Sequence, residues 1–181
     1  FYTFLILFIV LVLFGTIFIV KQQSAAVVER FGKFVSVRHS GLQIKIPIVD
    51  SVAGRLSLRI QQLDVVVETK TKDDVFVKVK VSVQYKVIKD KVYDAFYKLD
   101  FPQDQITSYV FDVVRAEVPK MILDDVFEKK DDIAIAVKSE LNEAMKNYGF
   151  DIIKTLVTDI DPDAQVKESM NRINAPEREK V

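Results

Sequence analysis

The first twenty residues form an uncharged, almost wholly apolar run. It reads FYTFLILFIVLVLFGTIFIV, and only Thr3, Gly15 and Thr16 interrupt its apolar and aromatic residues. As an α-helix, twenty residues rise about 30 Å, the thickness of the hydrocarbon core of a bilayer. A helix also satisfies its own backbone hydrogen-bonding groups, which lipid cannot do. The sequence therefore predicts a single transmembrane helix over residues 1–20.

Two other interpretations of this run fit the sequence less well. The apolar region of a signal peptide is shorter, and a buried helix has a polar face that this run lacks. The residues predicted to face lipid are Phe4, Leu5, Ile6, Leu7, Phe8, Ile9, Val10, Leu11, Val12, Leu13, Phe14, Ile17, Phe18, Ile19 and Val20. Because the chain starts at Phe1 rather than Met, we expect residues before it. Basic residues after the run favour a cytoplasmic location for the rest of the chain. The positive-inside rule compares both flanks of a span, and only one is present, so the side of the membrane stays undecided.

The composition excludes several classes of function. The 26 basic and 26 acidic residues balance to zero, so there is no basic footprint for nucleic acid. The absence of Cys excludes disulfides, thiolate metal sites and Cys nucleophiles. His39 is the only imidazole, it lies in a predicted turn, and no nucleophile-elbow motif accompanies it. We therefore predict no catalytic residue, no metal site and no cofactor.

Residues 21–161 are predicted to form an α+β domain with an antiparallel-rich sheet and packed helices. The alternation over Val75–Ile88 is typical of a strand with one buried face. Its predicted partner is Leu56–Lys70, where the alternation changes phase, and we attribute this to a β-bulge near Gln61. Further strands are predicted over 24–31, 34–38, 42–46 and 150–160. Helices are predicted over 90–99 and 102–118, and a third, longer helix is predicted to end at residue 148.

Two stretches are candidates for binding surfaces. The first holds Leu42, Ile44, Ile46 and Ile48, which either dip into the headgroup region or form an ordinary edge strand. The second is the helix predicted over residues 162–181, the start of a coiled coil. Its apolar residues Val166, Met170 and Ile173 recur at spacings of four and three. They form either an oligomer seam or a contact with the chain's own domain.

Long runs of this sequence resemble the SPFH (stomatin/prohibitin/flotillin) or band-7 family. The runs are QQLDVVVETKTKDDVFVKVKVSVQYKV over 61–87, GLQIKIPIVD over 41–50 and YVFDVVRAEVPKMILDDVFEKKDDIA over 109–134. The last of these and YGFDIIKTLVTDIDPDAQVKESMNRINA, over 148–175, are most similar to the branch of the plant hypersensitive-induced reaction proteins. The predicted transmembrane span is a difference from that branch, whose members are attached to the membrane by acylation. Pro176 departs from the Ala usual in the family and puts a continuous coiled coil in doubt.

The resemblance implies a membrane scaffold without catalytic residues. Members of the family assemble into rings or cages, organise membrane microdomains and regulate membrane-bound AAA+ proteases or channels. The expected partners are therefore the bilayer, further copies in a homo- or hetero-oligomer, and a protease or channel of this kind. A dedicated regulatory subunit without large self-assembly is the second hypothesis. A membrane-bound hydrolase is the third hypothesis. The chain has several Ser and Lys residues from which a catalytic Ser–Lys pair could be built, although no motif singles one out.

Overall fold

The computed structural model describes residues 1–178, and the side chains up to residue 173. The chain divides into two compact units. The first unit comprises Phe1–Ile60, Lys86–Asp100 and Lys146–Asp151. The second comprises Gln61–Tyr85, Phe101–Met145 and the chain from Ile152 onward.

The apolar run at the start of the first unit is only partly helical. Helix α1 (Tyr2–Thr16) leads into strand β1 (Ile17–Val20), which pairs antiparallel with β4 (Gly41–Ile44). The prediction of one helix over 1–20 is therefore wrong in its length. Three of the four β1 residues are β-branched and favour extended backbone once a partner strand is available. Among the described residues, no helix has the length and hydropathy that crossing a bilayer requires.

The first unit also holds a three-stranded antiparallel sheet in the order β3-β2-β5. Its strands are β2 (Ser24–Arg30), β3 (Lys33–Arg38) and β5 (Asp50–Ser57). Residues Ala25–Val28 are all buried, because both faces of β2 are covered. One face meets α2 (Val92–Tyr97), where the Phe96 ring lies against Gly54 of β5. The other face meets the β1–β4 ribbon, since the Arg55 side chain donates to the Ile19 carbonyl at 3.1 Å.

The second unit is built on a sheet in the order β6-β7-β8. Its strands are β6 (Gln61–Lys70), β7 (Phe76–Val87) and β8 (Phe150–Pro162). The predicted strand over 75–88 is confirmed, and β6 pairs with it without a register shift. The predicted bulge near Gln61 is wrong. The phase changes there because the segment contains the end of β5 and the start of β6, which belong to different sheets.

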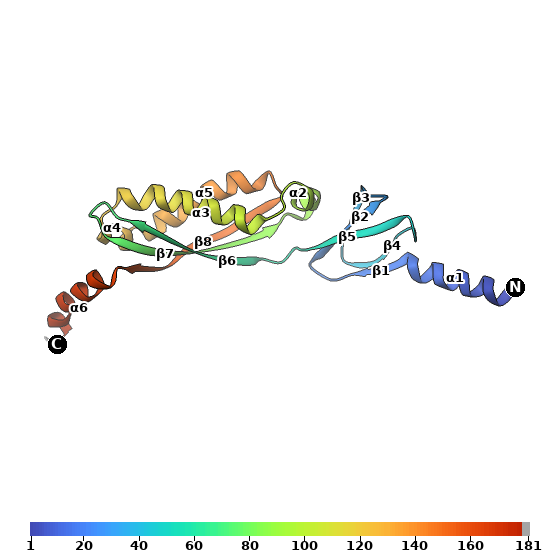
Figure 1. The fold of residues 1–181 in the computed structure, drawn as a ribbon, viewed down its shortest axis with the longest axis horizontal. Helices are drawn as coiled ribbons and strands as arrows, with labels where there is room; N and C mark the ends of the chain where they lie inside the picture. The colour runs from blue at the N-terminus through green and yellow to red at the C-terminus, as the bar shows by residue number, and fades with distance from the viewer. Residues whose placement is uncertain (179–181) are drawn as a thin grey trace. The chain divides into compact units, whose positions relative to one another are not determined.

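Helices cover one face of the β6-β7-β8 sheet. Helices α3 (Pro102–Glu117) and α5 (Lys130–Lys146) lie along this face, and α4 (Leu123–Glu128) lies near one end (Figure 1). Short 3-10 helices η1 (Lys89–Lys91) and η2 (Val118–Lys120) complete the connections. The core is mostly aliphatic: Val67, Val79, Val81, Val83, Ile106, Val110, Ile133, Val137 and Leu141 are almost fully buried, together with Tyr85 and Met145. Helix α6 (Ala164–Arg178) follows β8.

Candidate functional site

Helix α1 presents apolar side chains on every side. None of its residues is buried. The predicted lipid-facing residues with strongly exposed side chains are Phe4, Leu5, Ile6, Leu7, Phe8, Ile9, Val10, Leu11, Leu13, Phe14, Ile17 and Ile19. Val12 and Phe18 are half-buried, and Val20 is buried inside the unit. A surface of this kind is unfavourable in water and favourable in hydrocarbon.

The β1–β4 ribbon continues this apolar surface. Its register pairs Ile17 with Ile44 and Ile19 with Leu42, and such cross-strand partners share one face. All four side chains are exposed, whereas Val20, on the other face, is buried. The ribbon therefore has an apolar outer face that joins the end of α1. Only the fold brings Ile17 and Ile19 beside the predicted contact residues Leu42 and Ile44.

The loop after β4 holds the other two predicted contact residues in an exposed turn. Ile46 is exposed, and Ile48 is 93% exposed with a φ of 72°. A left-handed conformation is uncommon for a β-branched residue, so the surrounding contacts must hold it. Asp50 does so, because its backbone N–H donates to the Ile46 carbonyl at 2.9 Å. Its carboxylate also accepts the Ile46 N–H at 3.0 Å.

An ion pair between the half-exposed Arg30 and the buried Asp50 positions Asp50 itself. The Arg30 guanidinium donates from Nε to Asp50 Oδ1 at 2.7 Å and from Nη2 to Oδ2 at 3.3 Å. The Asp50 carboxylate is almost completely buried. The hydrogen bonds from Arg30 and from the Ile46 N–H hold the pKa of Asp50 below its ordinary value, against the opposing effect of its burial. The carboxylate is therefore ionised at neutral pH and ties the loop to β2.

The opposite face of the same sheet is closed by aromatic rings. Phe34 packs edge-on against Tyr93 and Tyr97, with ring centroids 4.8 and 5.9 Å apart. The Tyr97 hydroxyl donates to Glu29 Oε1 at 2.5 Å. Burial and this carboxylate raise the pKa of Tyr97 to about 12. The hydroxyl therefore stays protonated at physiological pH, which suits packing rather than acid–base chemistry.

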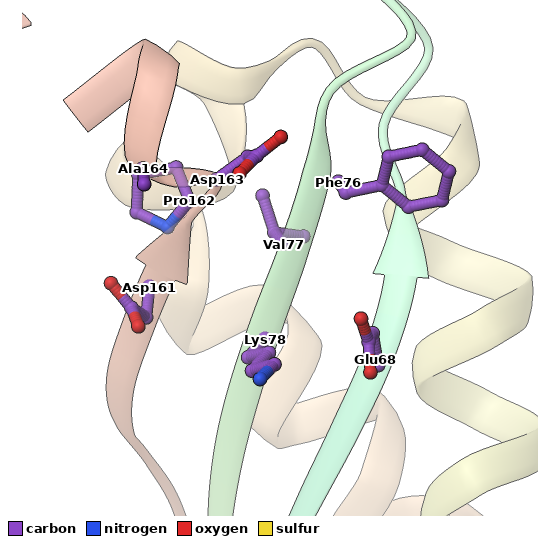
Figure 2. Close-up of a pocket in the computed structure, with 8 residues that line it drawn as sticks. All are labelled: Glu68, Phe76, Val77, Lys78, Asp161, Pro162, Asp163 and Ala164. Carbon is purple, nitrogen blue, oxygen red and sulfur yellow. The ribbon is translucent and has the colours of Figure 1, made fainter. Parts of the chain in front are cut away.

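The second unit contains a solvent-facing pocket of about 510 Å³ at the end of its sheet. Figure 2 shows Glu68, Lys78 and Asp161 side by side on β6, β7 and β8, with Phe76 beyond them. Asp161 is already paired with Lys167 at 3.1 Å. Such a row of alternating charges is typical of a solvated sheet face, and it contains no nucleophile beside a base.

The predicted seam on α6 lies on the surface. Val166 and Met170 are half-buried, and Ile173 is 73% exposed. Residues three and four apart share one side of a helix, so the three form a single apolar row. The helix continues past Pro176 to Arg178 and therefore does not end at this proline.

Sequence reasoning missed the polar residues that organise the first unit. Arg30 and Asp50 are twenty positions apart and meet only across paired strands. Ser36 and Arg38 lie on β3, with His39 directly after it, and no pattern in their sequence marks them. No group of three potential metal ligands occurs in the part of the chain that the structure describes.

Comparison with known proteins gives a consistent family match. Residues 18–181 match the SPFH domain / Band 7 family. Hypersensitive-induced response protein 4 of Arabidopsis thaliana is 48% identical over 160 residues, covering 88% of this chain and 55% of that protein. Human mitochondrial stomatin-like protein 2 is 32% identical over 162 residues, covering 89% of this chain and 45% of that protein. The chain thus spans about half the length of these relatives.

Proposed function

The chain belongs to the SPFH domain / Band 7 family, and we propose that it is a membrane-associated scaffold that self-assembles. Residues 1–20 anchor it in a bilayer, and copies associate through α6. Family membership supports a membrane-associated scaffold or regulatory role in general terms. Its greater identity to the hypersensitive-induced response protein than to stomatin-like protein 2 agrees with the resemblance of residues 109–134 and 148–175.

The observation that carries membrane attachment is the continuous apolar surface of the first unit. Helix α1 supplies most of it, and the outer face of the β1–β4 ribbon extends it. The loop adds Ile48 in a conformation that the Arg30–Asp50 pair holds. Burying apolar surface in lipid contributes about 25 cal/mol of favourable free energy per Å². An apolar surface that extends over a helix, a ribbon and a loop therefore favours insertion.

Vesicle flotation of the full chain tests the attachment. Leu11 on α1 is 69% exposed, and Ile135 on α5 is 66% exposed. Leu11→Lys should lower partitioning into phosphatidylcholine vesicles by about 100-fold, because a lysine in the hydrocarbon region costs about 3 kcal/mol. Ile135→Lys makes the same chemical change on the second unit and should leave partitioning unchanged. Equal partitioning of the two variants would contradict the proposed anchor.

Self-assembly is supported by the exposed apolar row on α6. Ile173→Glu places a charge in that row, whereas Asn171→Glu places one beside it on the same helix. Mass photometry in mild detergent should detect assemblies of the wild-type chain and of Asn171→Glu, and smaller species of Ile173→Glu. A wild-type chain that stays monomeric would exclude self-assembly and favour a regulatory subunit of a protease or channel.

A further inference from the structure

The turn between β2 and β3 holds a bulky apolar residue in a conformation that disfavours one. Arg30 pairs with Lys33, so the turn itself consists of Phe31 and Gly32. Their φ angles are 50° and 80°. Two-residue turns with a positive φ at both positions are typically Asn-Gly, Asp-Gly or Gly-Gly, because a larger side chain is unfavourable there. Formation of the hairpin therefore does not explain the phenylalanine.

Packing within the fold does not explain Phe31 either. Its side chain is 83% exposed, so it contributes little to the core of the unit. In the described part of the chain, Ile48 is the only other large apolar residue with a positive φ, and it is also strongly exposed. Strained backbone that places a side chain in solvent is typical of a functional surface. The two residues therefore call for a common explanation.

Phe31 and Ile48 lie at the same end of the β3-β2-β5 sheet. The register pairs Arg30 of β2 with Asp50 of β5, and the ion pair between their side chains fixes this arrangement. Phe31 follows Arg30 directly in the chain, and Ile48 lies two residues before Asp50. Because β2 and β5 are antiparallel, the end of one strand meets the start of the other. The turn and the loop therefore extend from one end of the sheet.

This end of the sheet lies beside the last turn of α1. Strand β4 runs back along β1, and the Lys45 N–H then donates to the Thr16 carbonyl at 2.8 Å. Pro47 lies next to the helix, because a Cβ added to Gly15 would be 3.3 Å from the Pro47 Cβ. The loop thus reaches the level at which α1 ends. Phe31, at the same end of the sheet as this loop, is continuous with the apolar surface of α1.

We propose that Phe31 inserts into the headgroup region of the bilayer and forms a second membrane contact beside α1. The proposal rests on the membrane attachment proposed above and specifies which end of the first unit faces the lipid. An exposed aromatic ring is favourable at the boundary between headgroups and hydrocarbon. Lys33 is exposed directly after the turn, where its ammonium group lies close to lipid phosphates.

Spin labels on single cysteines test the position of Phe31, because the chain has no Cys of its own. The full chain in phosphatidylcholine vesicles carries a nitroxide at Phe31→Cys or at Ile60→Cys. Ile60 is 58% exposed and follows the other end of β5, a strand of eight residues that spans about 26 Å. The label at residue 31 should collide with oxygen, which concentrates in lipid, and be shielded from a water-soluble nickel complex. The label at residue 60 should show the reverse.

A third label, at Leu11→Cys on α1, reports on the anchor separately. Water contact at residue 31 overturns the proposal, even if the label at residue 11 lies in lipid and the anchor holds. Lipid contact at residue 31 supports the proposal, even if the label at residue 11 lies in water and the anchor is wrong. Shielding of residue 31 from both oxygen and nickel would indicate burial against protein and would also overturn the proposal.

The variant Phe31→Asn separates membrane binding from stability. Asn-Gly is a favoured pair for this turn, so the urea midpoint should stay the same or rise. Partitioning into phosphatidylcholine vesicles should nevertheless fall by about 10-fold, because an apolar side chain is lost from the contact. Ile60→Asn removes an apolar side chain from the other end of the sheet and should leave partitioning unchanged. Equal falls in the two variants, or no fall in Phe31→Asn, would overturn the proposal.

Discussion

Replacing Gly149 with Ala should reveal how tightly the turn between α5 and β8 packs. Gly149 has a φ of 81°, and an added Cβ would meet the Lys91 carbonyl oxygen and the Ala95 nitrogen. Gly32, in the turn between β2 and β3, has a φ of 80°, but no atom lies within 4 Å of its added Cβ. The two substitutions therefore share the left-handed strain, and only one adds a clash.

The expected magnitudes follow from these two contributions. A left-handed conformation costs an L-residue about 1–2 kcal/mol, and the loss of chain entropy in the unfolded state offsets about 0.4–1 kcal/mol. Gly32→Ala should therefore destabilise by about 1 kcal/mol. Overpacking against backbone atoms adds about 1–3 kcal/mol. Gly149→Ala should therefore destabilise by about 3 kcal/mol, because the Lys91 carbonyl cannot swing away as a side chain would.

Urea unfolding in mild detergent, followed by circular dichroism, measures the two losses. Hydrogen exchange should localise the effect of Gly149→Ala. Its carbonyl accepts the Ile88 N–H at 2.8 Å, so the Ile88 amide should exchange faster in that variant than in Gly32→Ala. Equal destabilisation by the two substitutions would refute the steric argument and leave only the left-handed backbone as the cause.

Three further predictions concern the loop, its ion pair and the core. Because the pKa of Asp50 is depressed when folded, the stability that it contributes is complete above about pH 4. The contribution disappears as the pH falls through the folded pKa. The gap in urea midpoint between wild type and Asp50→Asn should therefore narrow as the pH falls below about 4, and a constant gap would argue against this account. Ile48→Gly should stabilise the first unit by about 1 kcal/mol by relieving left-handed strain, yet weaken vesicle flotation. A loss of both stability and binding would contradict the strained-loop interpretation. Leu141→Ala should cost about 2–5 kcal/mol in urea unfolding, because Leu141 is fully buried on α5. Leu156→Ala, at a partly exposed site, should cost clearly less.

Local periodicity was enough to predict much of the second unit. A strand exposes alternate residues to opposite faces, so the buried Val77, Val79, Val81 and Val83 are visible as a pattern in the sequence. The helical spacing in α3 and α5 is equally local. The same reasoning failed at Leu56–Lys70, because a bulge within one strand and a break between two strands produce the same change of phase. Only the pairing of β5 with β2 and of β6 with β7 distinguishes them.

For the candidate surfaces too, the sequence predicted some residues and missed others. The exposed loop residues Ile46 and Ile48 and the row on α6 were predicted from composition and spacing. The strand pairing of Ile17–Val20 was not, because hydropathy is the same for a helix and a strand. The Arg30–Asp50 pair and the position of Phe31 at the same end of the sheet as Ile48 were also missed. Each depends on residues brought together from distant positions by strand register.

The sequence alone determined where apolar surface gathers and which segments repeat with the period of a strand or a helix. These properties arise from neighbouring residues and need no partner. The tertiary structure decided which strands pair, and so which side chains share a face. That choice depends on contacts between distant segments, and it brings the turn at Phe31 to the same end of the sheet as the loop at Ile48.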